Sequence, residues 1–385
     1  MRYNNKSKTV SLRRIKEAGV IGSMAGAKRK KVTIVDVAAK AGVSKTTISR
    51  YLNGKFEYMS EESRQRIADV IEELGYRPNS LARSLKSKQS FVLGVIVSDI
   101  TSPFSPILLK GISDCCDRYG YRILIANSDD EPRKERDYIM NMIDQSVDGI
   151  ILNTTGGNDE FLRETADMGM KFVLADRTID LDLFDTVHSA DRDAIGQMMR
   201  YLKGVGYESV GFFTQPLTNS TRINRCQIFR EVYGSYFDGM AQVYFLEKKQ
   251  RDANVMQEFM RRNIDTKHAI FTGNGVATMR VVQTMRDLGI RFPQETGLCG
   301  FDDWEWMNLV GGGLTTIALP TYDVGKECVK RMMHLLNYSR AGEPRRVELP
   351  CTLQIRHSTR DAASGLFLRR GFPPYHTILK VNRYT

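Results

Sequence analysis

The sequence predicts an α/β protein in which a small all-α headpiece precedes a larger body of two lobes, each a doubly wound parallel sheet. Two patterns predict this architecture. Residues 32–78 show helical periodicity and helix-ending signals. From residue 91 onward, continuous apolar runs typical of buried parallel strands alternate with amphipathic helices, and this series occurs twice. The hydrophobic content of 42% and the charged content of 26% are those of an ordinary globular protein.

The stretch 33–52 predicts two short helices joined by a tight turn. Thr33 stands where an N-cap belongs, Gly42 supplies the turn, and Ser44 caps the second helix. The second helix directs short hydrogen-bonding groups and cations outward, namely Lys45, Thr46, Ser49 and Arg50. Such a helix in a unit of this size is typical of the recognition helix of a helix-turn-helix. A small helical hairpin with a solvated face is the alternative.

The positive charge of the chain is concentrated around this motif. Residues 1–90 contain 20 lysines and arginines against 8 aspartates and glutamates, whereas residues 91–385 contain 36 against 37. A basic run alone is usually a solvated tail, but this concentration beside a helix-turn-helix candidate favours nucleic acid as the partner. We expect residues 1–31 to form a disordered basic extension, and both Met1 and Met24 remain candidates for the start of translation.

A third helix and a short linker complete the N-terminal part. Ser60 opens the third helix with two glutamates in its first turn, Leu74 ends its apolar stripe, and Gly75 terminates it. The headpiece is therefore predicted over residues 32–78. Residues 79–90 form a linker whose first part, Asn79–Lys86, has a helical pattern that is too short to be stable alone in water, so it needs a partner such as DNA or a second copy of itself.

The body is predicted over residues 91–360 as two successive β-α-β series. The predicted strands are 92–97, 122–126, 149–152 and 172–175 in the first series, and 210–213, 269–271 and 297–301 in the second. A long helix at 324–336 and a strand near 346–355 are predicted to close the second series. Two α/β units of similar size imply a cleft between them. Residues 361–385 lack periodicity and are predicted to form a loose tail.

Several classes of protein find no support in the sequence. Its six cysteines show no metal-ligand spacing, and neither a zinc site nor a cofactor is predicted. No apolar run reaches about eighteen residues and the N-terminus has no secretory h-region, so we expect a cytoplasmic protein without a membrane span. No G-x-S-x-G, phosphate loop or pair of histidine ligands occurs, which argues against an enzyme.

The order of these parts resembles the lactose repressor/galactose repressor (LacI/GalR) family of bacterial transcription regulators over about residues 32–360. The stretches that carry the resemblance are TIVDVAAKAGVS (33–44), TISRYLN (47–53), LGYRPN (74–79) and GFDD (300–303). The resemblance implies a periplasmic-binding-protein-like body, and a homodimer or dimer of dimers on near-palindromic double-stranded operator DNA. It also implies a small effector of sugar or sugar-acid type, bound between the lobes.

The resemblance implies DNA contacts by the headpiece. Lys45, Thr46 and Arg50 are expected to reach base edges in the major groove. Arg50 is the best candidate for a bidentate contact to guanine, because its planar fork matches the O6/N7 pair. Four hydroxyl groups are expected to bind phosphates, with helix capping as the alternative role, namely those of Thr33, Ser44, Thr47 and Ser49.

The linker matches the hinge helix of the same family. Leu85 falls on the position of the apolar wedge that enters the minor groove, and Ala82 is small enough to let two hinge helices approach each other. Asn79 stands at the N-cap of this helix. The alternative is an ordinary apolar stripe that docks on the body.

The resemblance also implies effector contacts at the carboxyl ends of strands in the cleft. The expected residues are Phe104, Asp176, Arg222, Arg225, Asn274 and Asp302. Two guanidinium groups one helical turn apart, on Arg222 and Arg225, would suit a carboxylate or a phosphate. Many family members have Asn-Asp where this chain has Asn274-Gly275, so one customary carboxylate is missing. That departure is consistent with a sugar acid or a sugar phosphate as the effector.

The leading interpretation is a transcription regulator, most simply a repressor, that responds to an effector. The alternatives are an activator of the same family and a sugar-binding receptor without a DNA role, the second of which does not account for the headpiece. Whether the effector releases or promotes DNA binding stays open, as does the effector's identity. Trp304 or Trp306 is a further candidate for stacking on a sugar. The simpler interpretation is that these tryptophans lie in the core or at its rim.

Overall fold

A computed structural model describes most of the headpiece and of the body. The described residues are 32–52, 54–57, 59–76, 89–179, 183–337 and 343–360. The chain divides into two compact units, residues 1–88 and 89–385, which are described separately. The predicted N-terminal extension, the hinge helix with Asn79, Ala82 and Leu85, and the C-terminal tail lie outside the described residues.

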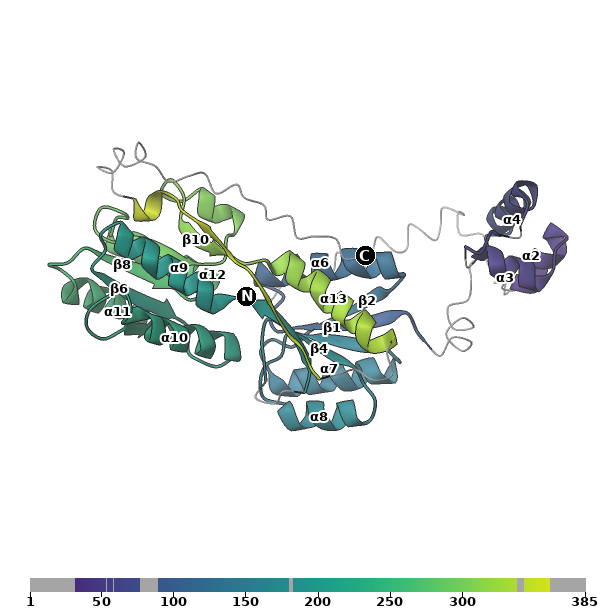
Figure 1. Cartoon of the computed structure of the whole chain (residues 1–385), viewed down its shortest axis with the longest axis horizontal. Coiled ribbons are helices and arrows are strands. Elements are labelled where there is room, and N and C mark those ends of the chain that lie inside the picture. The colour runs from purple at the N-terminus through teal and green to yellow at the C-terminus, as the bar shows by residue number, and fades with distance from the viewer. Residues whose placement is uncertain are drawn as a thin grey trace, which may run out of the picture. The chain divides into compact units, whose positions relative to one another are not determined.

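The described part of the headpiece contains three helices, which Figure 1 labels α2 (Ile34–Ala41), α3 (Lys45–Leu52) and α4 (Glu61–Leu74). The predicted caps are present: Thr33 forms a capping box with Asp36, and Gly42 ends α2 with φ 64°. The hydroxyl oxygen of Ser44 accepts from the backbone N–H of Thr47 at 3.1 Å. The three helices bury a small core of Val37, Ala38, Ala41, Ile48, Ile67, Val70 and Tyr76.

The first lobe of the body is a six-stranded parallel sheet in the order β11-β5-β4-β3-β1-β2. Its strands are β1 (Val92–Val97), β2 (Arg122–Asn127), β3 (Gly149–Leu152), β4 (Phe172–Ala175), β5 (Asp185–Ser189) and β11 (Arg346–Leu349). Its helices are α6 (Phe104–Tyr119), α7 (Pro132–Asp144), α8 (Asp159–Asp167) and α13 (Thr321–Asn337). Buried apolar side chains form one core on each side of the sheet.

The second lobe repeats this plan in the order β12-β10-β9-β8-β6-β7, with only β12 antiparallel. Its strands are β6 (Ser209–Thr214), β7 (Gln242–Phe245), β8 (His268–Thr272), β9 (Gly297–Phe301), β10 (Thr315–Ala318) and β12 (Thr352–Gln354). Its helices are α9 (Asp191–Gly204), α10 (Ser220–Tyr233), α11 (Lys249–Arg262), α12 (Gly275–Leu288) and the short η1 (Glu305–Asn308) and η2 (His357–Thr359).

The structure corrects the prediction that the last helix and strand close the second lobe. Helix α13 packs on α6 and on strands β4 and β5 of the first lobe (Figure 1). The predicted strand near 346–355 is two strands, and β11 joins the first sheet while β12 joins the second. The chain therefore returns to the first lobe before it ends in the second. The order of elements in the sequence could not predict which lobe α13 covers, because its apolar face could pack equally well on either sheet.

Helices α6 and α13 touch through their backbones at two glycines. A Cβ atom on Gly111 would lie 2.0 Å from the backbone oxygen of Tyr322, and one on Gly325 would lie 2.4 Å from the backbone oxygen of Leu108. Backbone atoms cannot move aside as a flexible side chain can. The absence of side chains at these two positions therefore fixes how closely the two helices approach.

Gly111→Ala is expected to lower the free energy of unfolding of the body by about 1–3 kcal/mol or more, because it overpacks this contact. The matched control is Gly196→Ala in α9, where a Cβ would meet nothing within 4 Å. That control is expected to gain roughly 0.5–1 kcal/mol from the higher helix propensity of alanine. Denaturant titration of both variants measures the difference, and equal midpoints would contradict the close contact.

Candidate functional site

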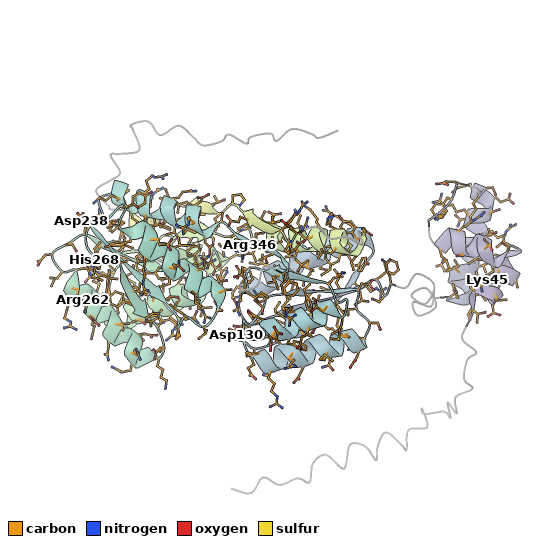
Figure 2. All side chains as sticks on the ribbon, turned by 60° about the horizontal axis from the view of Figure 1, so that its bottom comes forward. Lys45, Asp130, Asp238, Arg262, His268 and Arg346 are labelled. Atoms are coloured by element: carbon orange, nitrogen blue, oxygen red, sulfur yellow. The ribbon has the colours of Figure 1, made fainter. Side chains whose placement is uncertain are left out.

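The outward face of α3 carries exposed cations above a buried apolar side chain. Lys45, Thr46 and Arg50 are exposed, while Ile48 is fully buried. Figure 2 labels Lys45 on the surface of the headpiece. In the described part of the headpiece neither Lys45 nor Arg50 takes part in an ion pair; the ion pairs there join Lys40 to Glu73 and Arg64 to Glu61. Both cations of α3 are therefore available to an anionic partner.

The hydroxyl groups of Thr33, Ser44 and Thr47, which are predicted to bind phosphates, form contacts within the headpiece. The Thr33 hydroxyl donates to the Asp36 carboxylate at 2.7 Å, and the hydroxyls of Ser44 and Thr47 lie 2.9 Å apart. Ser49 is half-buried. Thr33 and Ser44 therefore have the helix-capping role that was the alternative. Binding of phosphates by these hydroxyl groups stays a prediction.

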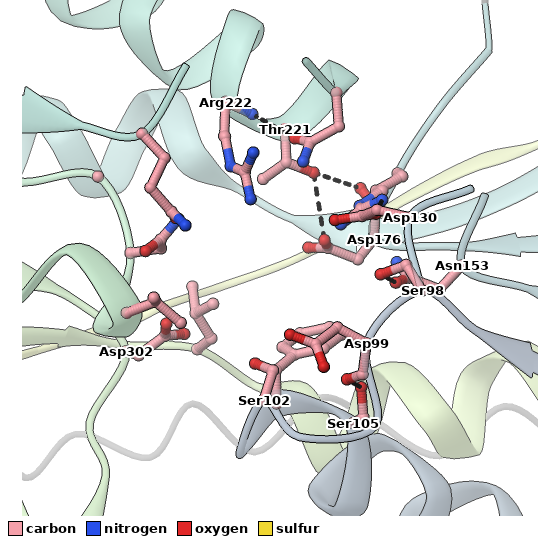
Figure 3. A pocket seen from close by; sticks show the side chains of 18 of the residues that line it. Ser98, Asp99, Ser102, Ser105, Asp130, Asn153, Asp176, Thr221, Arg222 and Asp302 are labelled. Atoms are coloured by element: carbon pink, nitrogen blue, oxygen red, sulfur yellow. Dashed lines mark hydrogen bonds and ion pairs between the residues drawn. The ribbon is translucent and has the colours of Figure 1, made fainter. Parts of the chain in front are cut away.

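The body has a cavity of about 130 Å³ between its two lobes (Figure 3). Loops at the carboxyl ends of strands from both sheets line it, as expected for doubly wound sheets. All six predicted effector residues line this cavity, namely Phe104, Asp176, Arg222, Arg225, Asn274 and Asp302. The structure thus brings together side chains from helices α6 and α10, from the N-cap of α12 and from the ends of strands β4 and β9, which lie far apart in the sequence.

Two aspartates occupy corresponding positions in the two lobes. Asp176 follows β4 and Asp302 follows β9, and these strands have equivalent places in the two sheets. Both residues have left-handed backbones, with φ 67° for Asp176 and φ 69° for Asp302. Aspartate and asparagine adopt this conformation more readily than other non-glycine residues. The left-handed turn brings each carboxylate to the wall of the cavity.

Arg225 is the buried cation between these aspartates. It is 3% exposed, and its guanidinium forms two hydrogen bonds to Asp191, at 2.8 and 3.3 Å. It also donates to the backbone oxygen of Gly273 at 3.0 Å and lies 3.9 Å above the ring of Phe301. Burial alone lowers the pKa of Arg225, but the carboxylates of Asp191, Asp176 and Asp302 outweigh it and raise the pKa. Arg225 is therefore already paired before any ligand arrives.

The two cavity aspartates are short of hydrogen-bond donors. Burial raises the pKa of Asp176 and of Asp302, and the positive charge of Arg225 offsets this only in part. Asp176 accepts from the Thr221 hydroxyl of the other lobe at 3.2 Å, and Asp302 accepts from the backbone N–H of Gly275 at 2.7 Å. A buried carboxylate has room for about four hydrogen bonds. Both groups can therefore accept hydrogen bonds from hydroxyls of a ligand.

Arg222 and Arg177 differ in their charge partners. Arg177 pairs with Asp130 at 2.5 Å and donates to the backbone oxygen of Thr154 at 3.0 Å. Arg222 donates to Thr218 and to a backbone oxygen, and among the described residues it forms no ion pair. Burial, and then the charge of Arg177, lowers the pKa of Arg222. In Figure 3 the Arg222 side chain extends from α10 into the cavity. Arg222, rather than Arg225, is the cation that lacks a carboxylate.

Sequence reasoning missed several residues of the site. The missed residues with polar side chains at the cavity are Ser98, Asp99, Ser102, Ser105, Asp130, Asn153, Arg177, Gln215, Asn219 and Thr221. Ser98, Asn153 and Gln215 come directly after β1, β3 and β6, and this position was a usable signal. Asp191 had no such signal, because its role depends on the packing of α9 against α10.

Asp302→Asn tests whether the buried carboxylate destabilises the protein without effector. Asparagine tolerates the left-handed backbone and keeps an acceptor for the N–H of Gly275. The raised pKa of Asp302 means that its charge costs stability as pH rises above the unfolded value of about 4. The variant is therefore expected to melt higher than the parent at pH 7 and equally near pH 4. The control is Asp303→Asn, which loses a paired charge to Arg356 and should melt lower. A lower melting temperature of Asp302→Asn at pH 7 would contradict the account.

Comparison with known families identifies the chain. Residues 33–79 match the family of bacterial regulatory proteins described as the lacI family. Residues 90–357 match the family described as periplasmic binding proteins and the sugar binding domain of the LacI family, and this match spans more than half of the chain. The chain belongs to the LacI family. The predicted resemblance and fold class are thereby confirmed.

Individual relatives agree with the family match. HTH-type transcriptional regulator KdgR of Bacillus subtilis (strain 168) is 37% identical, over 85% of this chain and 97% of the relative. HTH-type transcriptional regulator PtxS of Pseudomonas aeruginosa is 35% identical, over 86% of this chain and 96% of the relative. The solved lac repressor dimer, bound to operator and the anti-inducer ONPF, has the same fold with a TM-score of 0.71, at 22% identity over 86% of this chain and 99% of the repressor.

This LacI-family protein is therefore a DNA-binding transcriptional regulator with a sugar-binding type of body. In the part of the chain that the structure describes, no helix combines the length and apolar character needed to cross a membrane.

Proposed function

We propose that this LacI-family regulator is a cytoplasmic repressor that binds double-stranded operator DNA as a homodimer or a dimer of dimers. A small effector bound between the lobes controls that binding. The observation that carries the proposal is that one chain combines two parts. Its headpiece has a helix face whose cations form no ion pair with described headpiece residues, and its body has a polar cavity. A receptor without a DNA role would need no such headpiece.

For the headpiece, the proposal assigns base contacts to Lys45, Thr46 and Arg50 and phosphate contacts to the hydroxyls of α2 and α3. The exposure of the three base-contacting side chains and their lack of ion pairs within the described headpiece support this. In the linker, Leu85 would enter the minor groove as an apolar wedge, and Ala82 would allow two hinge helices to approach each other.

For the cavity, the proposed effector is a single sugar unit that carries a carboxylate or phosphate. Asp176 and Asp302 would accept hydrogen bonds from its hydroxyls, and Arg222 would bind its anionic group. The charge of Arg225 would offset part of the burial of the two aspartates, while its guanidinium stays paired with Asp191. The cavity of about 130 Å³ is smaller than the roughly 300–1,000 Å³ typical of sites for drug-sized ligands, which favours one sugar ring.

Control of DNA binding would follow from a difference in effector affinity between two arrangements of the lobes. Hydrogen bonds already join the lobes beside the cavity, from Thr221 to Asp176 and from Thr178 to Ser220. A ligand that bridges the same walls would change the balance between arrangements, and linkage then requires that operator DNA changes the affinity for the effector equally. The proposal is limited to regulation, because the relatives that match this chain are transcriptional regulators.

A thermal-shift screen of the full chain with D-glucose, D-gluconate, D-glucuronate and D-glucose 6-phosphate tests the effector class. An anionic compound is expected to raise the melting temperature, since a ligand that binds only the folded state stabilises it. Arg222→Ala is expected to weaken that binding about tenfold or more, because a charge-assisted hydrogen bond contributes roughly 1.5–3 kcal/mol.

The matched control is Arg230→Ala, an exposed arginine on the same helix, which should bind the compound like the parent. Equal stabilisation by D-glucose, or unchanged binding by Arg222→Ala, would contradict an anionic effector. No stabilisation by any compound would contradict the sugar-type effector itself.

A further inference from the structure

Gly275 and Trp304 fit together beside the Asp302 carboxylate. A Cβ atom on Gly275 would lie 2.5, 2.6 and 2.7 Å from three carbons of the Trp304 ring. A real Cβ never approaches other atoms so closely, so the indole occupies the space that any side chain at 275 would need. The backbone N–H of the same glycine donates to Asp302 at 2.7 Å. The indole and the carboxylate are thus both in contact with one residue.

The loop that carries Trp304 is fixed on both sides of the ring. Asp303 accepts two hydrogen bonds from the Arg356 guanidinium, at 2.6 and 2.8 Å, and one from the Thr316 hydroxyl at 2.8 Å. On the other side, the backbone N–H of Met307 donates to the backbone oxygen of Trp304 at 2.9 Å. Since an indole has no internal torsion, a substituent at 275 would have to displace the whole Trp304 ring.

Trp304 is 9% exposed and lines the cavity together with three other apolar side chains, Phe104, Val276 and Leu319. The polar side chains named above line the same cavity, so its wall is divided into apolar and polar parts. The pyranose or furanose ring of a sugar has the same division, with C–H groups on its faces and hydroxyls around its edge. An indole beside a carboxylate matches both parts of one ring.

We infer that Gly275 and Trp304 form a specificity-determining pair in the effector site. The inference rests on the proposed function, because it assumes a sugar-type effector in this cavity. A carboxylate at position 275 would supply a hydrogen-bond acceptor, and the indole of Trp304 supplies an apolar surface instead. The site therefore binds an effector whose C–H groups face Trp304 and whose hydroxyls face Asp302. Trp304 makes apolar contact with the effector, and Gly275 acts as the positioning residue that makes room for the ring.

The chain offers a direct probe, because Trp304 and Trp306 are its only two tryptophans. Trp306→Phe leaves Trp304 as the single tryptophan, and Trp304→Phe leaves Trp306, which does not line the cavity. Both full-length variants would be titrated with D-gluconate, D-glucuronate, D-glucose and D-glucose 6-phosphate while emission and melting temperature are recorded. A compound that raises the melting temperature is expected to change the emission of Trp304 and not that of Trp306. Trp304→Phe should bind it about two- to tenfold more weakly.

Gly275→Asp and Gly275→Ala in the Trp306→Phe background test the role of the glycine. The added atoms should displace the indole, shift the emission of Trp304 before any ligand is added, and weaken binding at least about tenfold for the aspartate. Gly196→Ala in the same background is the control and should change neither the emission nor the affinity, since a Cβ there meets nothing within 4 Å.

The outcomes separate the two proposals. A compound that stabilises the protein without changing the emission of Trp304, or that binds Gly275→Asp as tightly as the parent, would overturn the specificity pair and leave the proposed effector class standing. If no compound stabilises the parent or the Trp306→Phe variant, both the pair and the proposed effector class are wrong.

Discussion

Replacing Arg225 by alanine is expected to lower the free energy of unfolding of the body by about 3–5 kcal/mol, because removal of one partner leaves a buried charge without compensation. Arg225 is 3% exposed and is paired with Asp191, which is 7% exposed. The same substitution would leave Asp176 and Asp302 without the cation that offsets their burial. The variant is therefore expected to lose stability as well as effector binding, and denaturant titration of the full chain measures the loss.

Arg222→Ala is the matched control for Arg225→Ala. It removes the same type of side chain one helical turn away, yet Arg222 forms no ion pair with any described residue, so the loss of stability should stay within about 0.5 kcal/mol. Adding Asp191→Asn to Arg225→Ala should restore part of the lost stability, because it removes one of the stranded carboxylates. Equal losses in the two single variants would contradict the distinction between a paired and an unpaired arginine.

Replacing Arg50 by alanine is expected to reduce operator affinity by a factor of about 5 to 150, since a bidentate contact to a base contributes roughly 1–3 kcal/mol of discrimination. Affinity for a scrambled duplex of equal length should fall much less, because that binding depends on phosphate contacts. The measurement is fluorescence anisotropy at one fixed salt concentration, with an operator selected by the full chain from a random duplex library.

Arg66→Ala is the control for this experiment. Arg66 is an exposed arginine of the same headpiece on α4, so its loss removes the same charge away from α3. It should lower the affinity for both duplexes slightly and by the same factor. Equal losses on operator and scrambled duplex for Arg50→Ala would contradict base recognition by this residue.

The headpiece was predictable from sequence because its structural signals are local. The Thr33 capping box, the Gly42 turn and the Ser44 cap each involve residues within a few positions of one another. Capping chemistry and helical periodicity therefore sufficed to predict α2, α3 and α4. The residues of the hinge helix gave an equally clear sequence pattern, but its structure lies outside the described residues.

The strands of the body were predicted mainly where they contain a continuous apolar run. Strands such as β1 and β3 are continuous apolar runs, whereas β5, β7 and β10 were missed because polar residues such as Thr186, Gln242 and Thr315 interrupt their apolar pattern. The prediction that α13 closes the second lobe was wrong, because the position of this helix depends on its contact with α6, which lies far earlier in the chain. Such a contact leaves no trace in local periodicity.

The cavity shows the same division between local and non-local information. Asp176 and Asp302 could be predicted because each follows a recognisable strand. The pairing of Arg225 with Asp191 could not be predicted. It changes the interpretation of Arg222 and Arg225, since among the described residues Arg225 has a carboxylate partner and Arg222 has none. The structure also explains why position 275 has no carboxylate, because the Trp304 ring occupies the space that a side chain there would need.

The central claim is that ligand in the cavity controls the reading of DNA by α3. The most direct test is the affinity of the full chain for its selected operator, measured with and without D-gluconate, D-glucuronate and D-glucose 6-phosphate. At least one compound is expected to change the operator affinity of the parent and of Arg230→Ala about tenfold, within the usual range of allosteric coupling. At the lowest concentration that produces this change, the operator affinity of Arg222→Ala is expected to change much less, because its effector binding is weaker. An operator affinity that none of these compounds alters, in a protein that they nevertheless stabilise, would contradict the claim.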